Sequence, residues 1–295
     1  MLVDIKNILL PLNGTGDLDA VMSVAQNLAQ RFTAHLSAVV VGSDPSEIAA
    51  LAGGGISAGM VTEMIENATS EAERNAIIIG HNFQRFVADN DITLIDPTSM
   101  GLTSANGRTA SFEVLDGIDY DAMAWRSRLA DMTLVPTLTS TSDPRASATL
   151  HSILFDSGRP LVIAPPTAPE HVGRRISIAW NGTAEASLAL RCILPWAHDA
   201  EAIEVVTSPD YQRRGPEAED VVRYLRLHGI TATSRSCEPV KKDIGAGLLK
   251  AAEDFGADML ALGAYSHSPR FRQILLGGVT RHVLENMKLT VLMSR

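Results

Sequence analysis

The sequence predicts an α/β protein made of two similar halves, each a parallel β-sheet with helices on both faces. Short apolar runs typical of buried strands alternate along the chain with segments of helical periodicity, which is the pattern of parallel sheets. An apolar strand ending in Asn-Gly-Thr occurs twice, at 13–15 and at 181–183. The tripeptide Ala-Asp-Met also occurs twice, at 130–132 and at 257–259. Because both landmarks recur in the same order, the chain is interpreted as a duplicated unit.

Length and composition limit the class of protein. A chain of 295 residues is long enough for two domains of ordinary size. The formal net charge of -9 argues against general affinity for nucleic acid or for anionic membranes. Cys192 and Cys237 have neither a CxxC partner nor a histidine at ligand spacing, so neither a zinc site nor a disulfide framework is expected. With no long apolar run and no signal-peptide pattern at the start, a cytoplasmic location is expected.

Five strands and the helices between them are predicted in the first half. Thr15 or Asp17 is the expected N-cap of the first helix. Residues 44–90 have no counterpart in the second half and are interpreted as an insertion with its own helix. The strands are expected at 5–12, 35–41, 92–95, 132–135 and 160–164, and the helices at 18–28, 60–86, 120–129 and 146–155.

The second half repeats this alternation in a shorter form. Thr183 and Asp243 are the expected N-caps of two of its helices. The proline-rich stretch 165–169 is typical of a stiff linker, which gives domains at 1–165 and 170–295. The strands are expected at 175–180, 202–207, 230–236, 259–262 and 289–293, and the helices at 186–193, 217–228, 243–255 and 279–284.

The stretch that follows the strand 259–262 is the best candidate for an anion-binding site. Small residues at 263–266 allow a sharp turn, a polar loop with Arg270 follows, and Gly277 and Gly278 begin a helix. Free backbone N–H groups and the helix dipole favour a negative charge at such a helix start. Tight turns and close helix–sheet packing explain the same glycines equally well, because isolated glycine pairs are weak motifs.

This segment resembles the C-terminal part of a universal stress protein (UspA-type) domain. In that family a Gly-x-x-Gly motif, a spacer and a Gly-Ser/Thr pair hold the phosphates and ribose of ATP or AMP. Gly263 matches the first glycine, and Ser266 stands where the second belongs. The spacer 267–276 is one residue longer than usual, and Gly278 replaces the Ser or Thr. The resemblance covers nearly the whole chain and is weakest over 44–90.

The resemblance implies a specific architecture. Two tandem Rossmann-like domains (UspA/adenine nucleotide alpha hydrolase-like) would each contain a five-stranded parallel sheet of order 3-2-1-4-5. The domains would pack about a pseudo-two-fold axis through their last strands and form an intramolecular pseudo-dimer. Tandem proteins of this kind often dimerise further, so a homodimer is one of the expected assemblies.

The resemblance also places a nucleotide in the second domain, in the crevice beyond its first and fourth strands. The expected ligand is ATP or AMP, with Mg²⁺ only together with ATP. Asn13 and Asn181 stand where the family's nucleotide binders usually have Asp, so they bring no charge for a divalent ion. Asn-Gly is equally typical of a plain turn. The implied contacts are Ala179, Asn181, Val206, Gly263, Ser266, Ser268, Arg270, Gly277, Gly278 and Val279.

The first domain has a degenerate form of this motif, with Pro136 at the position of Gly263. No nucleophile elbow, HExxH motif or paired carboxylates occur, so no catalytic or metal-binding residue is predicted, and chemistry is limited to slow ATP hydrolysis. His151 and His282 fall at equivalent places on helices of the two halves, where packing or interface roles are expected.

Three functions remain open. The first is a cytosolic stress-response regulator with an adenine nucleotide in its second domain. The second is a nucleotide-free interaction protein of the same fold, which Asn181, Ser266 and the longer spacer favour. The third is a small-metabolite-binding α/β protein that uses the crevice under a roof formed by the insertion 44–90.

Overall fold

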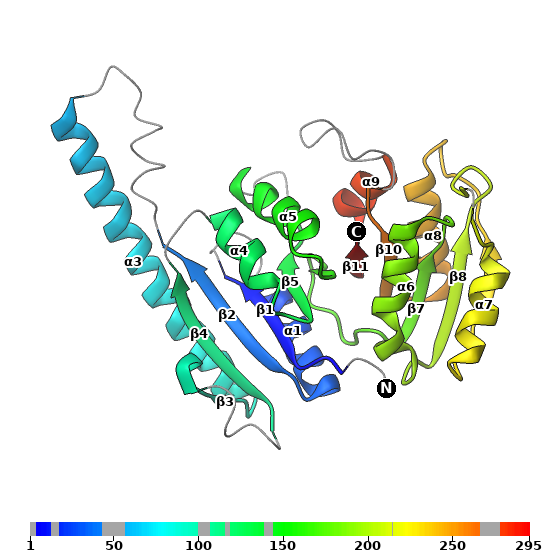
Figure 1. Ribbon diagram of the computed structural model, residues 1–295, viewed down its shortest axis with the longest axis horizontal. Helices are drawn as coiled ribbons and strands as arrows, with labels where there is room; N and C mark the ends of the chain where they lie inside the picture. Colours follow the sequence, from blue (N-terminus) through cyan, green and yellow to red (C-terminus); the bar gives the residue numbers. More distant parts are fainter. Residues whose placement is uncertain are drawn as a thin grey trace.

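The computed structural model contains one continuous β-sheet flanked by helices (Figure 1). It describes residues 4–12, 18–42, 57–99, 107–115, 119–138, 144–213, 215–265 and 278–295. None of the helices in these ranges is both long and apolar enough to cross a membrane.

The elements of the two halves follow one another in the predicted alternation. The first half contains β1 (Asn7–Pro11), α1 (Leu18–Phe32), β2 (His35–Val41), α3 (Ala58–Asp89), β3 (Thr93–Leu94), the 3-10 turn η2 (Pro97–Ser99), β4 (Thr109–Leu115), α4 (Asp119–Ser127), β5 (Met132–Pro136), α5 (Pro144–Asp156) and β6 (Leu161–Ala164). The second half contains β7 (Arg175–Ala179), α6 (Ala184–Ala197), β8 (Ala202–Thr207), α7 (Ala218–Leu227), β9 (Thr233–Ser236), α8 (Ile244–Phe255), β10 (Met259–Gly263), α9 (Gly278–Asn286) and β11 (Thr290–Ser294).

The sheet has the strand order β3-β4-β2-β1-β5-β6-β11-β10-β7-β8-β9. The second half therefore has the predicted order 3-2-1-4-5, and so does the first half once its edge strand β3 is set aside. Pairing is parallel within each half. The last strands of the two halves, β6 and β11, pair antiparallel, with Leu292 opposite Val162. This antiparallel pair joins the halves into a single sheet.

The predicted third strand of the first half was wrong. Residues 92–95 form only the two-residue strand β3, whose residues are exposed at the edge of the sheet. The third strand is β4, in which Ser111 and Glu113 interrupt the apolar residues. Because β4 lacks a continuous apolar run, its sequence does not look like a buried strand. The described part of the first half thus contains six strands, not five.

Helices cover both faces of the sheet. One apolar cluster joins α1, α3, α6 and α7 to one face, and Phe83, Leu28, Ile193 and Leu225 are among its buried members. A second cluster joins α4, α5, α8 and α9 to the other face, with Met123, Ile153, Leu248 and Val283. The helix expected at 60–86 is present as α3, which lies at one end of the molecule while α7 lies at the other (Figure 1).

Two of the predicted N-caps are confirmed. The hydroxyl of Thr183 accepts a hydrogen bond from Ala186 N at 3.3 Å at the start of α6. The carboxylate of Asp243 accepts one from Ala246 N at 3.0 Å at the start of α8. These contacts satisfy N–H groups that a helix leaves free in its first turn. Thr15 and Asp17 lie outside the described residues.

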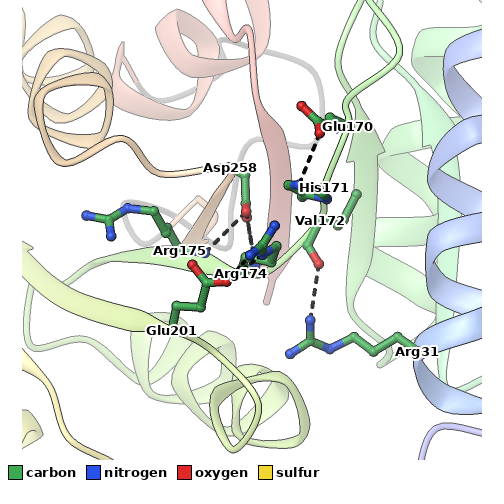
Figure 2. A network of polar contacts seen from close by, with 8 residues as sticks. All are labelled: Arg31, Glu170, His171, Val172, Arg174, Arg175, Glu201 and Asp258. Carbon is green, nitrogen blue, oxygen red and sulfur yellow. Dashed lines mark hydrogen bonds and ion pairs between the residues drawn. The ribbon is translucent and has the colours of Figure 1, made fainter.

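The link between the halves is held by the polar network drawn in Figure 2. The carboxylate of Asp258 accepts hydrogen bonds from the backbone N–H groups of Gly173, Arg174 and Arg175. From α1, the Arg31 guanidinium donates to Val172 O at 3.4 Å and to Trp196 O at 2.7 Å. Arg31 thereby connects the first half to the segment before β7 and to the C-terminal end of α6, where a cation complements the helix dipole.

Candidate crevice at the carboxyl ends of β7, β8 and β10

The strand order of the second half reverses at β7, which pairs with β8 on one side and with β10 on the other. Ligands of open α/β sheets bind beyond the carboxyl ends of strands at such a switch point. Ala179 stands opposite Val206 in β8 and opposite Leu262 in β10. The sheet therefore brings Ala179, Asn181, Val206 and Gly263 to one edge, as the sequence predicted.

The remaining predicted site residues divide into two groups. Gly278 and Val279 begin α9, where Gly278 is exposed and Val279 is partly buried. The other four, Ser266, Ser268, Arg270 and Gly277, lie outside the described residues. Their places in the site stay predictions.

The side chain of Asn181 forms hydrogen bonds within the turn that contains it. It is 1% exposed, and its Oδ1 accepts hydrogen bonds from Thr183 N at 3.2 Å and from Thr183 Oγ1 at 2.8 Å. Gly182 follows with a φ of 79°, a left-handed angle that favours glycine. The side-chain oxygen thus stabilises the Asn-Gly-Thr turn, which leaves the amide NH₂ as the group that this side chain has to offer a ligand.

The segment that follows β8 packs against this turn. Arg213 N donates to Asn181 O at 2.8 Å, and an added Cβ at Gly215 would lie 2.2 Å from Gly182 O. Trp180 Nε1 donates to Pro216 O at 2.8 Å. Residues 213, 215 and 216 are therefore in direct contact with the segment 180–182 at the edge of the crevice.

The side chain of Tyr211 holds the same segment against the apolar core. Its side chain is 5% exposed and belongs to the apolar cluster that contains Ala179, Val206 and Leu262. Burial raises the pKa of its phenol well above the ordinary value. Ala179 and Val206 are each 1% exposed. The side of the crevice expected to receive the base is thus closed by the chain's own residues, which the sequence analysis missed.

Gly263 is closely packed, whereas Gly278 has no close neighbour among the described residues. An added Cβ at Gly263 would lie 2.3 Å from Ala186 N and 2.5 Å from Glu185 C, so β10 touches the start of α6 through backbone atoms. This contact supports the packing explanation for Gly263. An added Cβ at Gly278 would meet no described heavy atom within 4 Å. The space in front of α9 is therefore open among the described residues.

No group of three or more His, Cys, Asp or Glu side chains suitable for a metal ion occurs among the described residues. His282 Nδ1 lies 2.8 Å from Asp243 Oδ2 next to the start of α8, and His151 Nε2 lies 2.9 Å from the Tyr265 hydroxyl. Both histidines thus have packing partners. In the first half Pro136 ends β5, and the residues 139–143 that follow fall outside the described ranges.

Comparison with known proteins shows which proteins share this fold. Residues 182–295 match the sequence model of the universal stress protein family. The structure of a universal stress protein from Archaeoglobus fulgidus DSM 4304 covers 98% of both chains with a TM-score of 0.69 at 11% identity. The second half of the chain thus contains a universal stress protein domain. The structure of a functionally unknown protein from Pseudomonas aeruginosa PAO1 matches 98% of this chain and 92% of its own, with a TM-score of 0.56 at 14% identity.

These likenesses assign the fold of the first half as well. The family's sequence model matches only the second half of the chain, whereas the full-length structural matches include both halves. No curated protein sequence matches the chain. At identities this low, the similarity establishes the fold alone. Any ligand has to be inferred from the residues of the site.

Proposed function

We propose that this chain is a universal stress protein, a cytoplasmic stress-response regulator whose second half binds an adenine nucleotide, ATP or AMP. The observation that carries the proposal is the start of α9, the helix after β10, which is open among the described residues. Gly278 has no described neighbour within 4 Å of an added Cβ. The first-turn N–H groups of a helix have no intrahelical acceptor and favour phosphate oxygens.

In this proposal the phosphates lie at the first turn of α9, next to the N–H groups of Gly278 and Val279. Ser266, Ser268, Arg270 and Gly277 are proposed as further contacts from the sequence motif. The ribose and base lie toward Asn181 and Val206. Because residues 208–213, 215 and 216 cover that side, a bound base has to displace some of them.

A nucleotide-free interaction protein is the second candidate, and two observations favour it. Asn181 Oδ1 is already bonded to Thr183. The contact of Gly215 with Gly182 closes the edge of the crevice that a base would use. If these contacts persist, the second half presents a surface without a ligand site.

Calorimetric titration of AMP and ATP into the purified chain separates the two candidates. Gly278→Val fills the space before α9 without meeting described atoms, so we expect it to fold and to bind at least about tenfold more weakly. Gly59→Val is the matched control, because Gly59 also lies in the first turn of a helix and its added Cβ would meet no described atom within 4 Å. No heat from either nucleotide at millimolar concentration would favour the interaction protein.

A further inference from the structure

A side-chain contact between the two halves lies at the end of β10. The hydroxyl of Tyr265 is 2.9 Å from Nε2 of His151, a residue of α5 in the first half. Tyr265 is the second residue after β10 and belongs to the second half. The contact therefore joins a helix of one half to the chain that leaves the fourth strand of the other.

The hydrogen-bond partners of His151 fix the direction of this contact. His151 Nδ1 lies 2.6 Å from the backbone oxygen of Ser147, which can only accept, so Nδ1 carries the proton. In the neutral ring Nε2 then accepts from the Tyr265 hydroxyl. Burial raises the pKa of Tyr265, so its phenol remains protonated and able to donate at neutral pH.

Aromatic packing supports the same pair. The ring of Phe155, one turn further along α5, lies 4.9 Å from the Tyr265 ring. The guanidinium of Arg295 stacks over Phe155 at 3.9 Å. Ala264 N donates to Ser294 O at 2.9 Å, which ties the preceding residue to the end of β11. Tyr265 is thus held from both halves.

The backbone of Tyr265 needs such support. Its φ is 58°, in the left-handed region, which costs a residue with a side chain free energy that surrounding contacts have to offset. In this conformation Tyr265 fixes the backbone directly after the end of β10. A change at its side chain is therefore transmitted to the backbone at the edge of the crevice.

We propose that His151 is a positioning residue for the second half's ligand site, acting through its hydrogen bond to Tyr265. The first half then has a defined role even though its own motif is degenerate: it holds the exit from β10 in the conformation that binds ligand. The link to ligand affinity rests on the nucleotide site proposed above, whereas the effect on the Tyr265 backbone does not.

The test uses His151→Phe, Tyr265→Phe and the double variant in the full chain. His151→Phe removes the acceptor and keeps a ring, and Tyr265→Phe removes only the donor. Tyr224→Phe is the matched control, because Tyr224 lies on α7 and contacts His228 through its ring. Amide hydrogen exchange of Ala264 and Tyr265 is measured without nucleotide, and AMP affinity is measured by calorimetry.

We expect both single variants to increase exchange at Ala264 and Tyr265 by about fivefold, as loss of one ordinary hydrogen bond gives. AMP affinity should fall by a similar factor. The double variant should be no weaker than either single variant, because both remove the same bond. The Tyr224→Phe chain should behave as the wild type in both measurements.

Two outcomes overturn the proposal. Unchanged exchange at Ala264 and Tyr265 in both single variants means that the hydrogen bond does not hold this backbone. Wild-type AMP affinity in variants with increased exchange means that the contact is merely structural. If the wild type binds neither AMP nor ATP, the proposed nucleotide site fails, while increased exchange still supports His151 as the residue that positions the exit from β10.

Discussion

Asp131 and Asp258 make the same contact in the two halves. Asp131 Oδ2 accepts hydrogen bonds from the backbone N–H groups of Lys6 at 2.7 Å and Asn7 at 2.9 Å, at the start of β1. Asp258 Oδ1 accepts one from Gly173 N at 2.7 Å, and its Oδ2 accepts from Arg175 N at 3.2 Å, at the start of β7. The repeated Ala-Asp-Met is therefore explained by sheet assembly, because each aspartate fixes the first strand of its half beside the fourth.

We expect Asp258→Ala to lower the free energy of unfolding by about 2–3 kcal/mol, because several backbone N–H groups lose a charged acceptor. Asp131→Ala, which leaves two N–H groups without that acceptor, should cost about 1–2 kcal/mol. Urea unfolding followed by tryptophan fluorescence measures both. Asp258→Asn retains an acceptor oxygen and should fall between the wild type and Asp258→Ala. A loss below about 0.5 kcal/mol in Asp258→Ala would show that water replaces the carboxylate.

The two described glycines of the predicted motif should respond differently to alanine. Gly263→Ala places a Cβ against backbone atoms of Glu185 and Ala186, which cannot move as a flexible side chain would. We expect it to lower the free energy of unfolding by about 2–3 kcal/mol. Gly278→Ala places its Cβ more than 4 Å from every described heavy atom and should change stability by less than about 0.5 kcal/mol. Equal losses in urea unfolding would mean that the space before α9 is filled.

The sequence was sufficient to predict most of the sheet, for a physical reason. Strands such as β1, β5 and β10 are buried on both faces, and their sequences are nearly continuous apolar runs. The strand β4 carries Glu113, which forms an ion pair with Arg126 of α4, so its polar residues are satisfied by a neighbour distant in sequence. Such compensation cannot be recognised from a local pattern.

The candidate site, like the sheet, could be predicted from the sequence only in part. Its position followed from the strand order and the Asn-Gly-Thr repeat, which place Asn181 and Gly263 at one edge. That edge is closed by the contact between Gly182 and Gly215. Tyr265 is held in place by a hydrogen bond to His151, which lies 114 positions away in the sequence. Both are tertiary contacts between residues with no shared local motif, so periodicity and spacing carried no signal for them.

His35 gives this protein a predictable dependence on pH. At the start of β2, its ring nitrogens lie 2.8 Å from Thr109 Oγ1 and 3.0 Å from Ser111 Oγ, and burial lowers its pKa from 6.5 to about 4. Between these two values the unfolded chain binds a proton that the folded chain does not. The contribution of His35 to stability is therefore complete above about pH 6.5 and is lost progressively as the pH falls toward 4.

We expect His35→Gln, which retains hydrogen-bonding groups but does not titrate, to lose less free energy of unfolding between pH 7 and pH 5 than the wild type does. Urea unfolding of both chains at the two pH values measures the difference, so a constant cost of the substitution cancels. His81→Gln, at an exposed position of α3, is the control and should keep the wild-type pH dependence. If His35→Gln and the wild type lose the same amount, the ring of His35 is hydrated in solution and the lowered pKa is wrong.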